Sequence, residues 1–320
     1  MNNEVPHLRE LLENSPTNRG RWGPDDEVGA LNYLDQAAVL RGVAEVRTGK
    51  TFTLQVQIGH PHGDPAFPGP RGPARRTNIM DRGVYLGGAG TVFPGGLEFA
   101  DDMIIMYLQG SSQYDALGHL WYGDQIWNGY PAETTTGGMK KASILPIAEK
   151  GIVGRGVLID IARHRGKPYL DKGETFSHAD IQEAAMEQGV ELQRRDILLI
   201  HTGWLGYFYG TPNEEFYEGF IEPGLTYTPE LVQWFADMEI PSLITDTIAN
   251  EVTTDPVSGV TLPLHNALMR NLGITFAEII ALDALAADCA QDGQYSFLYT
   301  AAPLKVVEGS GSPVNPIVIK

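Results

Sequence analysis

The run from Gln109 to His119 holds the side chains of this sequence that are best suited to chemistry. Two amides, Gln109 and Gln113, precede a carboxylate, Asp115, and an imidazole, His119, within eleven residues. Carboxylate and imidazole groups are common ligands of divalent metal ions, amide oxygens are weaker neutral ligands, and histidine can also move a proton near neutral pH. The residue types therefore allow a metal site. The alternative is a loop at a strand end whose polar side chains bind backbone donors.

Neither a strand nor a helix alone can bring these four side chains to one point. An extended strand would spread positions 109 to 119 over about 33 Å. A helix would set position 113 beside 109 but turn 115 about 200° away from 113. A shared site therefore needs a strand end, a turn through residues 110–112 and a bend near Gly118. The apolar residues 103–108 predict a buried strand directly before the run. Loops that follow a buried strand often carry catalytic or binding residues.

The rest of the sequence predicts a single α/β domain over residues 1–320 with a mixed sheet. Apolar or alternating runs predict strands at residues 51–58, 152–161, 196–201, 242–247, 295–299 and 304–307. Helix signals, including capping residues, favour helices after residues 22–27 and at residues 34–44, 180–189, 228–238 and 264–273. Residues 59–100 are rich in Gly and Pro, so we expect a long irregular segment that acts as a lid or pocket wall.

Composition narrows the function class. The net charge of −17 argues against nucleic acid and against anionic membrane surfaces as partners. No apolar run approaches 18 residues, and the first 15 residues lack the basic and apolar regions of a secretory signal. The one cysteine, Cys289, excludes an intrachain disulfide and fits a reducing compartment. We therefore expect a cytoplasmic protein that acts on a small molecule.

Further histidines are candidates for contact with that small molecule. His60 and His62 stand in His-Pro-His-Gly-Asp-Pro after a predicted strand, a pattern similar to the start of some hydrolase metal sites. The continuation of those sites is missing, so we expect these two histidines to contact substrate or to lie on the surface. His201 ends a predicted strand and precedes Thr-Gly-Trp204. His201 and Trp204 are candidates to line the site, and the alternative is a purely structural role.

The run from 109 to 119 resembles the signature of the cyclase family of metal-dependent hydrolases, which includes bacterial kynurenine formamidase and isatin hydrolase. The family pattern is H-x-G-T-H-x-D-x-P-x-H. Gln109 and Gln113 stand at its first two histidines, Leu117 stands at its proline, and Asp115 and His119 match. A branch of the family that resembles trans-dienelactone hydrolase carries the pattern Q-x-x-x-Q-x-D-x-x-x-H. Residues 109–119 of this chain match that pattern at every fixed position. The similarity extends to residues 22–27, 201–204, 263–278 and 302–316, and so covers nearly the whole chain.

The resemblance implies a metal centre, a fold and an assembly. In the family, a downstream His and a Glu complete the centre, and His265 and Glu278 are the matching pair. The implied metal ligands are Gln109, Gln113, Asp115, His265 and Glu278. His119 is implied as the general acid and base. The implied fold is the swivelling β/β/α arrangement, and the implied assembly is a homo-dimer or tetramer.

These features together predict a hydrolase that opens a lactone or a cyclic amide with a metal-activated water. A lactone is favoured because of the dienelactone-like motif. Amides in place of imidazoles favour a harder ion such as Mn²⁺, whereas the family implies zinc. The alternatives are an amidase of the kynurenine formamidase or isatin hydrolase type, and a metal-free binding protein on the same fold. An unrelated amidohydrolase that uses His60 and His62, and ring closure instead of hydrolysis, also stay open.

Overall fold

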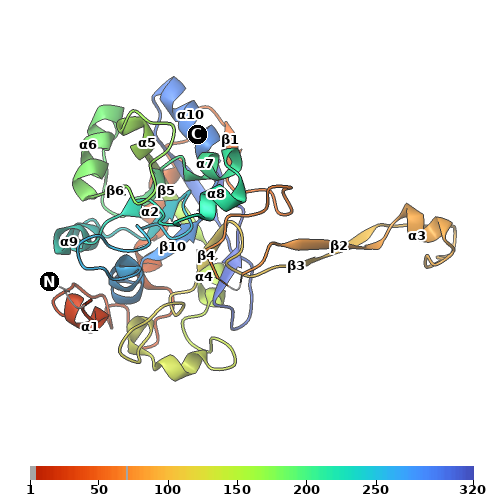
Figure 1. Cartoon of the computed structure of the whole chain (residues 1–320), viewed down its shortest axis with the longest axis horizontal. Coiled ribbons are helices and arrows are strands. Elements are labelled where there is room, and N and C mark those ends of the chain that lie inside the picture. The colour runs from red at the N-terminus through yellow and green to blue at the C-terminus, as the bar shows by residue number, and fades with distance from the viewer. Residues whose placement is uncertain (1–4, 70) are drawn as a thin grey trace.

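A nine-stranded mixed sheet forms the centre of the computed structural model, which describes residues 5–69 and 71–320 (Figure 1). The strand order is β1-β13-β11-β5-β7-β9-β10-β4-β12. These strands are β1 (Thr51–Thr53), β4 (Gln113–Asp115), β5 (Ile152–Asp160), β7 (Ile197–His201), β9 (Ser242–Thr245), β10 (Thr275–Glu278), β11 (Ser296–Ala301), β12 (Gly311–Pro313) and β13 (Ile317–Ile319). The neighbours β5, β7, β9 and β10 are parallel, and the strands on either side are antiparallel. The predicted α/β class with a mixed sheet is confirmed. Residues 1–4, which fall in the segment examined for a secretory signal, and Pro70 lie outside the described residues.

The parallel strands form where the sequence has unbroken apolar runs. Leu198, Leu199 and Ile200 of β7 are fully buried, as expected for a strand that is covered on both faces. Helix α2 (Gln36–Val43) packs closely on β5. A Cβ added to Gly42 would lie 2.5 Å from the carbonyl carbon of Gly154, so only glycine permits this approach. The predicted strands at residues 152–161, 196–201 and 242–247 are therefore present and form the core of the sheet.

Helices surround this sheet, and several begin or end at the predicted residues. Asp35 caps α2 by accepting from Ala38 N at 2.8 Å, and Thr228 caps α9 (Pro229–Asp237) by accepting from Leu231 N at 3.0 Å. Gly189 ends α6 (His178–Gln188) in the left-handed conformation, with φ of 68°. The remaining helices are α1 (Leu8–Leu11), α3 (Arg82–Leu86), α4 (Ile144–Lys150), α5 (Ile161–His164), α7 (Trp204–Gly210), α8 (Asn213–Tyr217), α10 (Asp283–Asp292), the 3-10 helices η1 (Gly29–Tyr33), η2 (Trp127–Gly129) and η3 (Ala132–Thr135), and the π-helix η4 (His265–Arg270).

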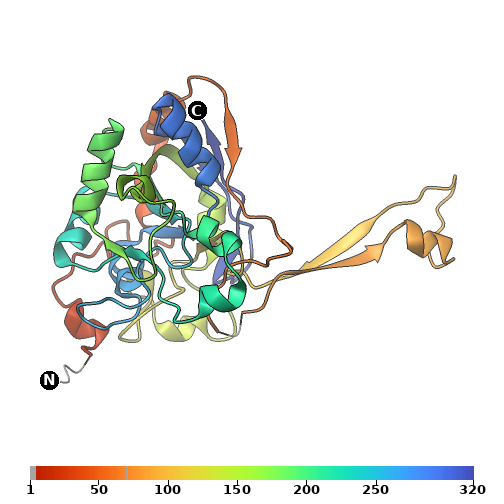
Figure 2. The ribbon, with the colours of Figure 1, turned by 45° about the horizontal axis from the view of Figure 1, so that its top comes forward.

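Two further pairs of strands lie outside the main sheet. The short strands β6 (Thr175–Phe176) and β8 (Gly224–Leu225) pair in parallel. Strands β2 (Arg75–Met80) and β3 (Asp101–Ile105) pair in antiparallel fashion and form an arm with α3 near its tip. We refer to residues 75–105 as the arm. It projects from the body of the protein in both ribbon views (Figures 1 and 2).

The arm corrects two predictions. Residues 103–108 were predicted as a buried strand, but β3 ends at Ile105 and every residue of β3 is exposed. An apolar run in the sequence does not show whether its side chains pack in the core or lie on the surface. The irregular segment predicted over residues 59–100 is also wrong in part, because β2 and α3 occupy residues 75–80 and 82–86.

Other boundaries differ for local reasons. β1 ends at Thr53 instead of residue 58, because its partner β13 begins only after Pro316, which has no N–H to donate. Residues 304–307 form no strand, and β12 and β13 close the sheet instead. The helix predicted at residues 264–273 is present but is π-helical over η4. No helix within residues 5–69 and 71–320 has the length and apolar character needed to cross a membrane.

Candidate metal centre

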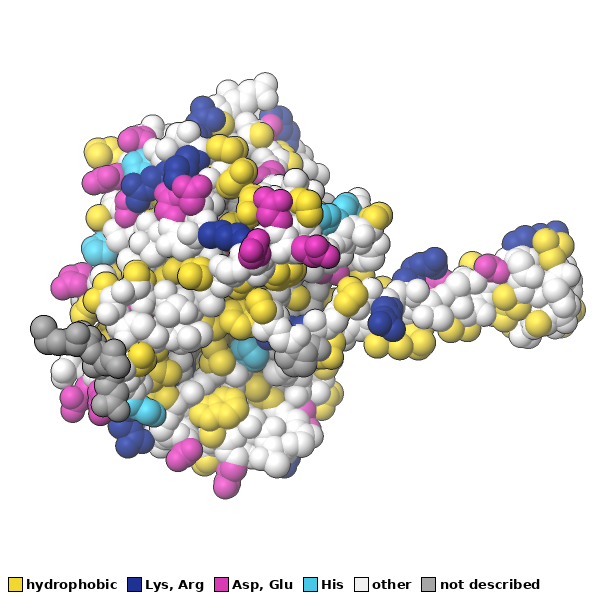
Figure 3. Space-filling model, in the orientation of Figure 1, with side chains coloured by type: hydrophobic (Ala, Val, Ile, Leu, Met, Phe, Trp, Pro, Cys, Tyr) yellow, Lys and Arg dark blue, Asp and Glu magenta, His cyan; other side chains and the backbone are white. Residues whose placement is uncertain are grey.

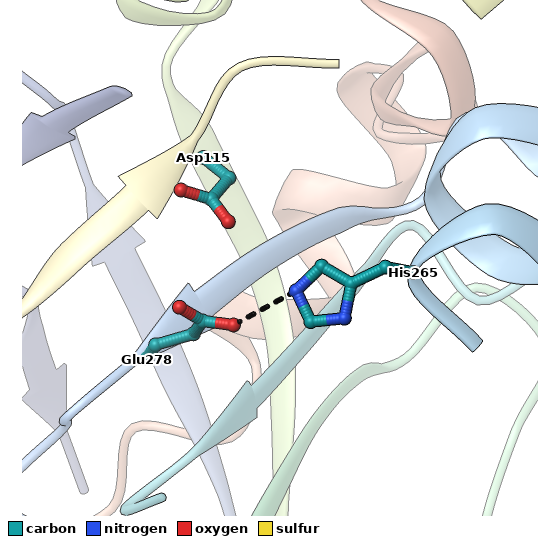
Figure 4. A group of neighbouring side chains, drawn as sticks. All are labelled: Asp115, His265 and Glu278. Carbon is teal, nitrogen blue, oxygen red and sulfur yellow. Dashed lines mark ion pairs between the residues drawn. The ribbon is translucent and has the colours of Figure 1, made fainter. Parts of the chain in front are cut away.

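Asp115, His265 and Glu278 each bring a possible ligand atom to within 4.8 Å of the others (Figure 4). Asp115 ends β4, Glu278 ends β10, and His265 begins η4. All three are buried, with exposed fractions of 1%, 3% and 3%. The structure therefore brings together three of the five residues that were predicted as metal ligands.

Strand register positions the two carboxylates. β4 pairs with β10 so that Gln113 lies opposite Glu278, and Gln113 Nε2 donates to Glu278 Oε2 at 2.8 Å. On its other side β4 pairs with β12, where Gly311 lies opposite Asp115. A Cβ on Gly311 would lie 2.7 Å from Gln109 Nε2, so this glycine leaves room for the Gln109 amide. The predicted ligand Gln113 thus lies beside the cluster, in contact with Glu278.

Glu251 orients the imidazole of His265. Its carboxylate accepts from the backbone N–H groups of Leu264 and His265, each at 2.7 Å, and lies 2.6 Å from His265 Nδ1. This leaves His265 Nε2 facing Glu278 Oε1 at 3.2 Å. Burial opposes the charged imidazole, but the hydrogen bonds to Glu251 and Glu278 raise the pKa of His265 to about 10. A carboxylate that holds the far nitrogen of a histidine is typical of metal-binding histidines.

The residues present fit a divalent cation. Asp115 Oδ1 and Gln113 Oε1 are buried and have no hydrogen-bond partner among the described residues. A buried polar atom without a partner costs about 1–3 kcal/mol, which a bound cation would remove. Burial, with a contribution from the charge of Glu278, raises the pKa of Asp115 to about 6, and a bound cation would lower it. The donor atoms are oxygen and nitrogen, which suits zinc and manganese alike.

His119 and Gln109 form a pair next to this cluster. Gln109 Nε2 donates to Ser310 Oγ at 3.0 Å and lies 3.4 Å from His119 Nδ1. Burial lowers the pKa of His119, although the charge of Asp115 opposes that shift. His119 is therefore neutral at pH 7 and able to accept a proton. The structure places the predicted ligand Gln109 beside His119 and Ser310.

His60 and His62 line a cavity of about 700 Å³ that reaches Gly110, the residue after Gln109. The cavity also contains Arg71, whose Nη1 donates to the carbonyl oxygen of Gln109 at 3.2 Å. Aromatic side chains, including Phe208, form part of its wall, and the ring of His62 meets that of Phe208 edge-on with centroids 4.8 Å apart. The two histidines thus share a cavity with the central run.

His201 and Trp204 lie in other clusters of the described chain. His201 Nδ1 is 2.8 Å from Asp160 Oδ1, and Nε2 is 3.2 Å from Asp283 Oδ1. Burial opposes protonation, but these two carboxylates raise the pKa of His201 to about 10. Trp204 is fully buried, with its ring 5.0 Å from that of Phe216. Contact of His201 or Trp204 with a substrate stays a prediction.

Sequence reasoning missed three residues that support the cluster. Glu251 orients His265, Asn250 Nδ2 donates to Glu278 Oε1 at 3.1 Å, and Ser310 accepts from Gln109. Asn250 and Glu251 follow β9, the parallel neighbour of β10. Polar residues beyond the carboxyl ends of adjacent parallel strands are a known signal of a site, and that signal was available here.

Comparison with known proteins places this geometry in a family. Residues 52–252 match the family model described as "Putative cyclase". A solved structure of a novel cyclase superposes with a TM-score of 0.87 at 36% identity, covering 95% of this chain and 100% of that chain. This chain belongs to the cyclase family. The cyclase-family fold expected from the resemblance is therefore confirmed, whereas the dienelactone-like branch stays a prediction.

More distant structures share the cyclase fold. Isatin hydrolase A from Ralstonia solanacearum superposes with a TM-score of 0.61 at 18% identity, covering 88% of this chain and 95% of that chain. Isatin hydrolase A from Labrenzia aggregata, bound to benzyl benzoate, superposes with a TM-score of 0.55 at 20% identity, covering 89% of this chain and 98% of that chain. Comparison with curated proteins finds no match.

Proposed function

We propose that this cyclase-family protein is a metal-dependent hydrolase that opens a lactone or a cyclic amide. The observation that carries the proposal is the buried cluster of Asp115, His265 and Glu278, with the neutral His119 beside it. The fold shared with isatin hydrolases supports a cyclic substrate, because isatin is a cyclic amide. The match of Gln109, Gln113, Asp115 and His119 to the dienelactone-like motif favours a lactone.

Asp115, His265 and Glu278 would hold the metal ion, and Gln113 Oε1 offers a further oxygen. Such an ion, when bound, supplies a Lewis acid that polarises a carbonyl group and lowers the pKa of water. The chain itself fixes the ligands. Gln113 and Asn250 each donate to a different oxygen of Glu278, and Glu251 keeps Nε2 of His265 directed toward the cluster.

His119 would move the proton that ring opening requires. Its Nδ1 lies 3.4 Å from the Gln109 amide nitrogen, and the tautomer decides which ring nitrogen carries the proton. The ring nitrogen without a proton would take one from the attacking water, and the imidazolium would return a proton to the oxygen or nitrogen that leaves the carbonyl carbon. The ring C–O or C–N bond breaks, and one carboxylate forms on the same molecule.

The cavity beside Gly110 would hold the body of the substrate. The cavity has a volume of about 700 Å³. Its aromatic wall favours an apolar ring, and His60, His62 and Arg71 offer polar contacts. Small-molecule sites are usually concave and mostly apolar, with a few polar groups that set orientation. The size and lining of this cavity therefore support a compact cyclic substrate.

Metal content and hydrolysis, measured on matched histidine variants, test this proposal. His265→Gln should lose the bound zinc or manganese found in wild-type protein by elemental analysis, and should lose hydrolysis of a panel of lactones and cyclic amides. His201→Gln is the control for metal content, because His201 is also buried between carboxylates, in a different cluster. Metal retained by His265→Gln would refute the assigned centre. Wild-type protein that takes up neither Zn²⁺ nor Mn²⁺ would favour a metal-free binding protein.

A further inference from the structure

Arg71 brings a positive charge into the cavity beside the central run. Of the described residues that line this cavity, Arg71 alone carries a guanidinium or ammonium group. Its Nη1 donates to the carbonyl oxygen of Gln109 at 3.2 Å. Arg71 forms no ion pair in the described part of the chain, unlike Arg76 and Arg82, which pair with acids of the arm. A guanidinium has five N–H donors, so donors other than the one on Gln109 are available to a ligand.

Asp64 also lines the cavity but forms no ion pair with Arg71. Its Oδ1 accepts from Ser111 Oγ at 3.3 Å. Burial raises the pKa of Asp64, and the charge that opposes this shift is that of His60. The charge of Arg71 acts instead on the proton carrier, because it adds to the burial that lowers the pKa of His119. Arg71 is thus an unneutralised positive charge near His119, in a protein of net charge −17.

We propose that Arg71 is a carboxylate-binding residue and that its ligand is the ring-opened product. The identity of the ligand rests on the proposed function, because hydrolysis of a lactone or cyclic amide turns a neutral carbonyl group into a carboxylate. Of the two protons of the attacking water, one goes to the leaving oxygen or nitrogen, and the other is lost when the new acid ionises. Arg71 therefore gains an ionic partner only as the reaction proceeds, which favours the reaction over tight binding of the substrate.

The position of Arg71 fits this role. Arg71 binds the carbonyl oxygen of Gln109, and the side chain of Gln109 lies 3.4 Å from His119 Nδ1. In the cavity wall, the rings of Phe67 and Phe220 meet edge-on with centroids 6.2 Å apart and offer an apolar surface to the rest of the product. A guanidinium can hold a carboxylate through two parallel N–H···O bonds. A phosphate dianion would bring a second charge, for which the described lining has no second guanidinium or ammonium group.

Titration calorimetry with two probes of the same shape tests this assignment on full-length protein as purified. Benzoate carries a ring and a carboxylate, and benzamide replaces the carboxylate by a neutral amide. Wild type should bind benzoate at least tenfold more tightly, because hydrogen bonds to charged groups contribute more than those to neutral groups. Arg71→Gln should lose most of this preference and bind benzamide within threefold of wild type. Arg71→Lys, which keeps the charge but not the planar fork, should keep part of the preference.

Arg75→Gln is the matched control. Arg75 is exposed and begins β2, and in the space-filling view basic side chains lie along the arm, which projects from the body (Figure 3). This variant should keep the wild-type preference for benzoate. A metal ion in the centre can also bind a carboxylate, but it is present in wild type and in Arg71→Gln alike. The difference between these two proteins therefore reports the contribution of Arg71.

Three results would overturn the proposal. The first is a wild type that does not prefer benzoate, or does not bind it at about 10 mM. The second is a preference that Arg71→Gln retains. The third is an equal loss of both probes in Arg71→Gln, which would leave Arg71 only the structural contact with Gln109. None of these results concerns metal content or hydrolysis, so they are distinct from failure of the proposed function. A benzoate preference that depends on Arg71, in a protein that binds no metal and opens no ring, would support the carboxylate site and refute only the hydrolase.

Discussion

Replacing Glu251 with Gln is the sharpest test of how the chain prepares His265. One carboxylate oxygen of Glu251 accepts from His265 N and lies 2.6 Å from His265 Nδ1, while the other accepts from Leu264 N. An amide has only one acceptor atom. If the oxygen of the introduced amide faces His265, the amide NH₂ group faces the backbone N–H of Leu264. Two donors then face each other in a fully buried position, and neither has an acceptor. If the amide flips, its NH₂ group faces His265 Nδ1 and leaves the proton on Nε2, where a metal ion would bind.

Both outcomes have a calculable cost. Loss of the buried hydrogen bond to Leu264 costs about 1–3 kcal/mol of stability. Loss of the group that orients a metal-binding histidine typically costs 10- to 100-fold in metal affinity, which corresponds to about 1.4–2.7 kcal/mol. We therefore expect Glu251→Gln to bind Zn²⁺ or Mn²⁺ at least tenfold more weakly than wild type, while remaining folded.

Competition with a chromophoric chelator measures that affinity directly. Glu239→Gln is the matched control, because Glu239 is also a buried glutamate, but its partners are Arg21, Arg194 and Arg195. The control should lose stability and keep its metal affinity. If Glu251→Gln binds metal within threefold of wild type, the orienting role of Glu251 is wrong.

Two further changes probe separate parts of the structure. His119→Gln should keep the bound metal and lose at least 100-fold in turnover, because we assign His119 as a proton carrier beside the cluster and not as a metal ligand. Equal turnover in the variant and in wild type would refute that assignment. The raised pKa of His201, about 10 against about 6.5 in the unfolded chain, adds stability that is complete below about pH 6.5 and is lost as pH rises to 10. Urea unfolding of wild type should lose on the order of 2–4 kcal/mol between pH 6.5 and 10, and a similar loss in His201→Gln would refute the assignment.

Sequence reasoning reached the fold and the centre by different routes. The parallel strands β5, β7 and β9 could be predicted from apolar runs, because a strand that is buried on both faces consists almost entirely of apolar residues. The grouping of Asp115 with His265 and Glu278 came from a family resemblance, since about 150 residues separate them and spacing carries no information over that distance.

The features that sequence reasoning missed depend on tertiary contacts. Glu251 is one of 40 acidic residues, and its position beyond β9 makes it a site candidate without showing that its carboxylate would hold His265. The apolar residues of β3 were predicted as core because a hydrophobic pattern does not show where in the fold its side chains lie. The contacts of the two His201 ring nitrogens with Asp160 and Asp283 likewise join distant parts of the chain and have no signal in the sequence.

The position of β4 in the sheet has a consequence for how the protein is made. β4 lies between β10 and β12, although its residues 113–115 precede theirs by more than 150 positions. Closing a chain loop of that length costs about 4–5 kcal/mol of entropy, and non-local pairing of this kind slows folding. During synthesis, Asp115 must wait as part of an unpaired strand until residues 275–278 and 311–313 have left the ribosome. Metal uptake should therefore be one of the last steps of maturation, after the sheet has closed around β4.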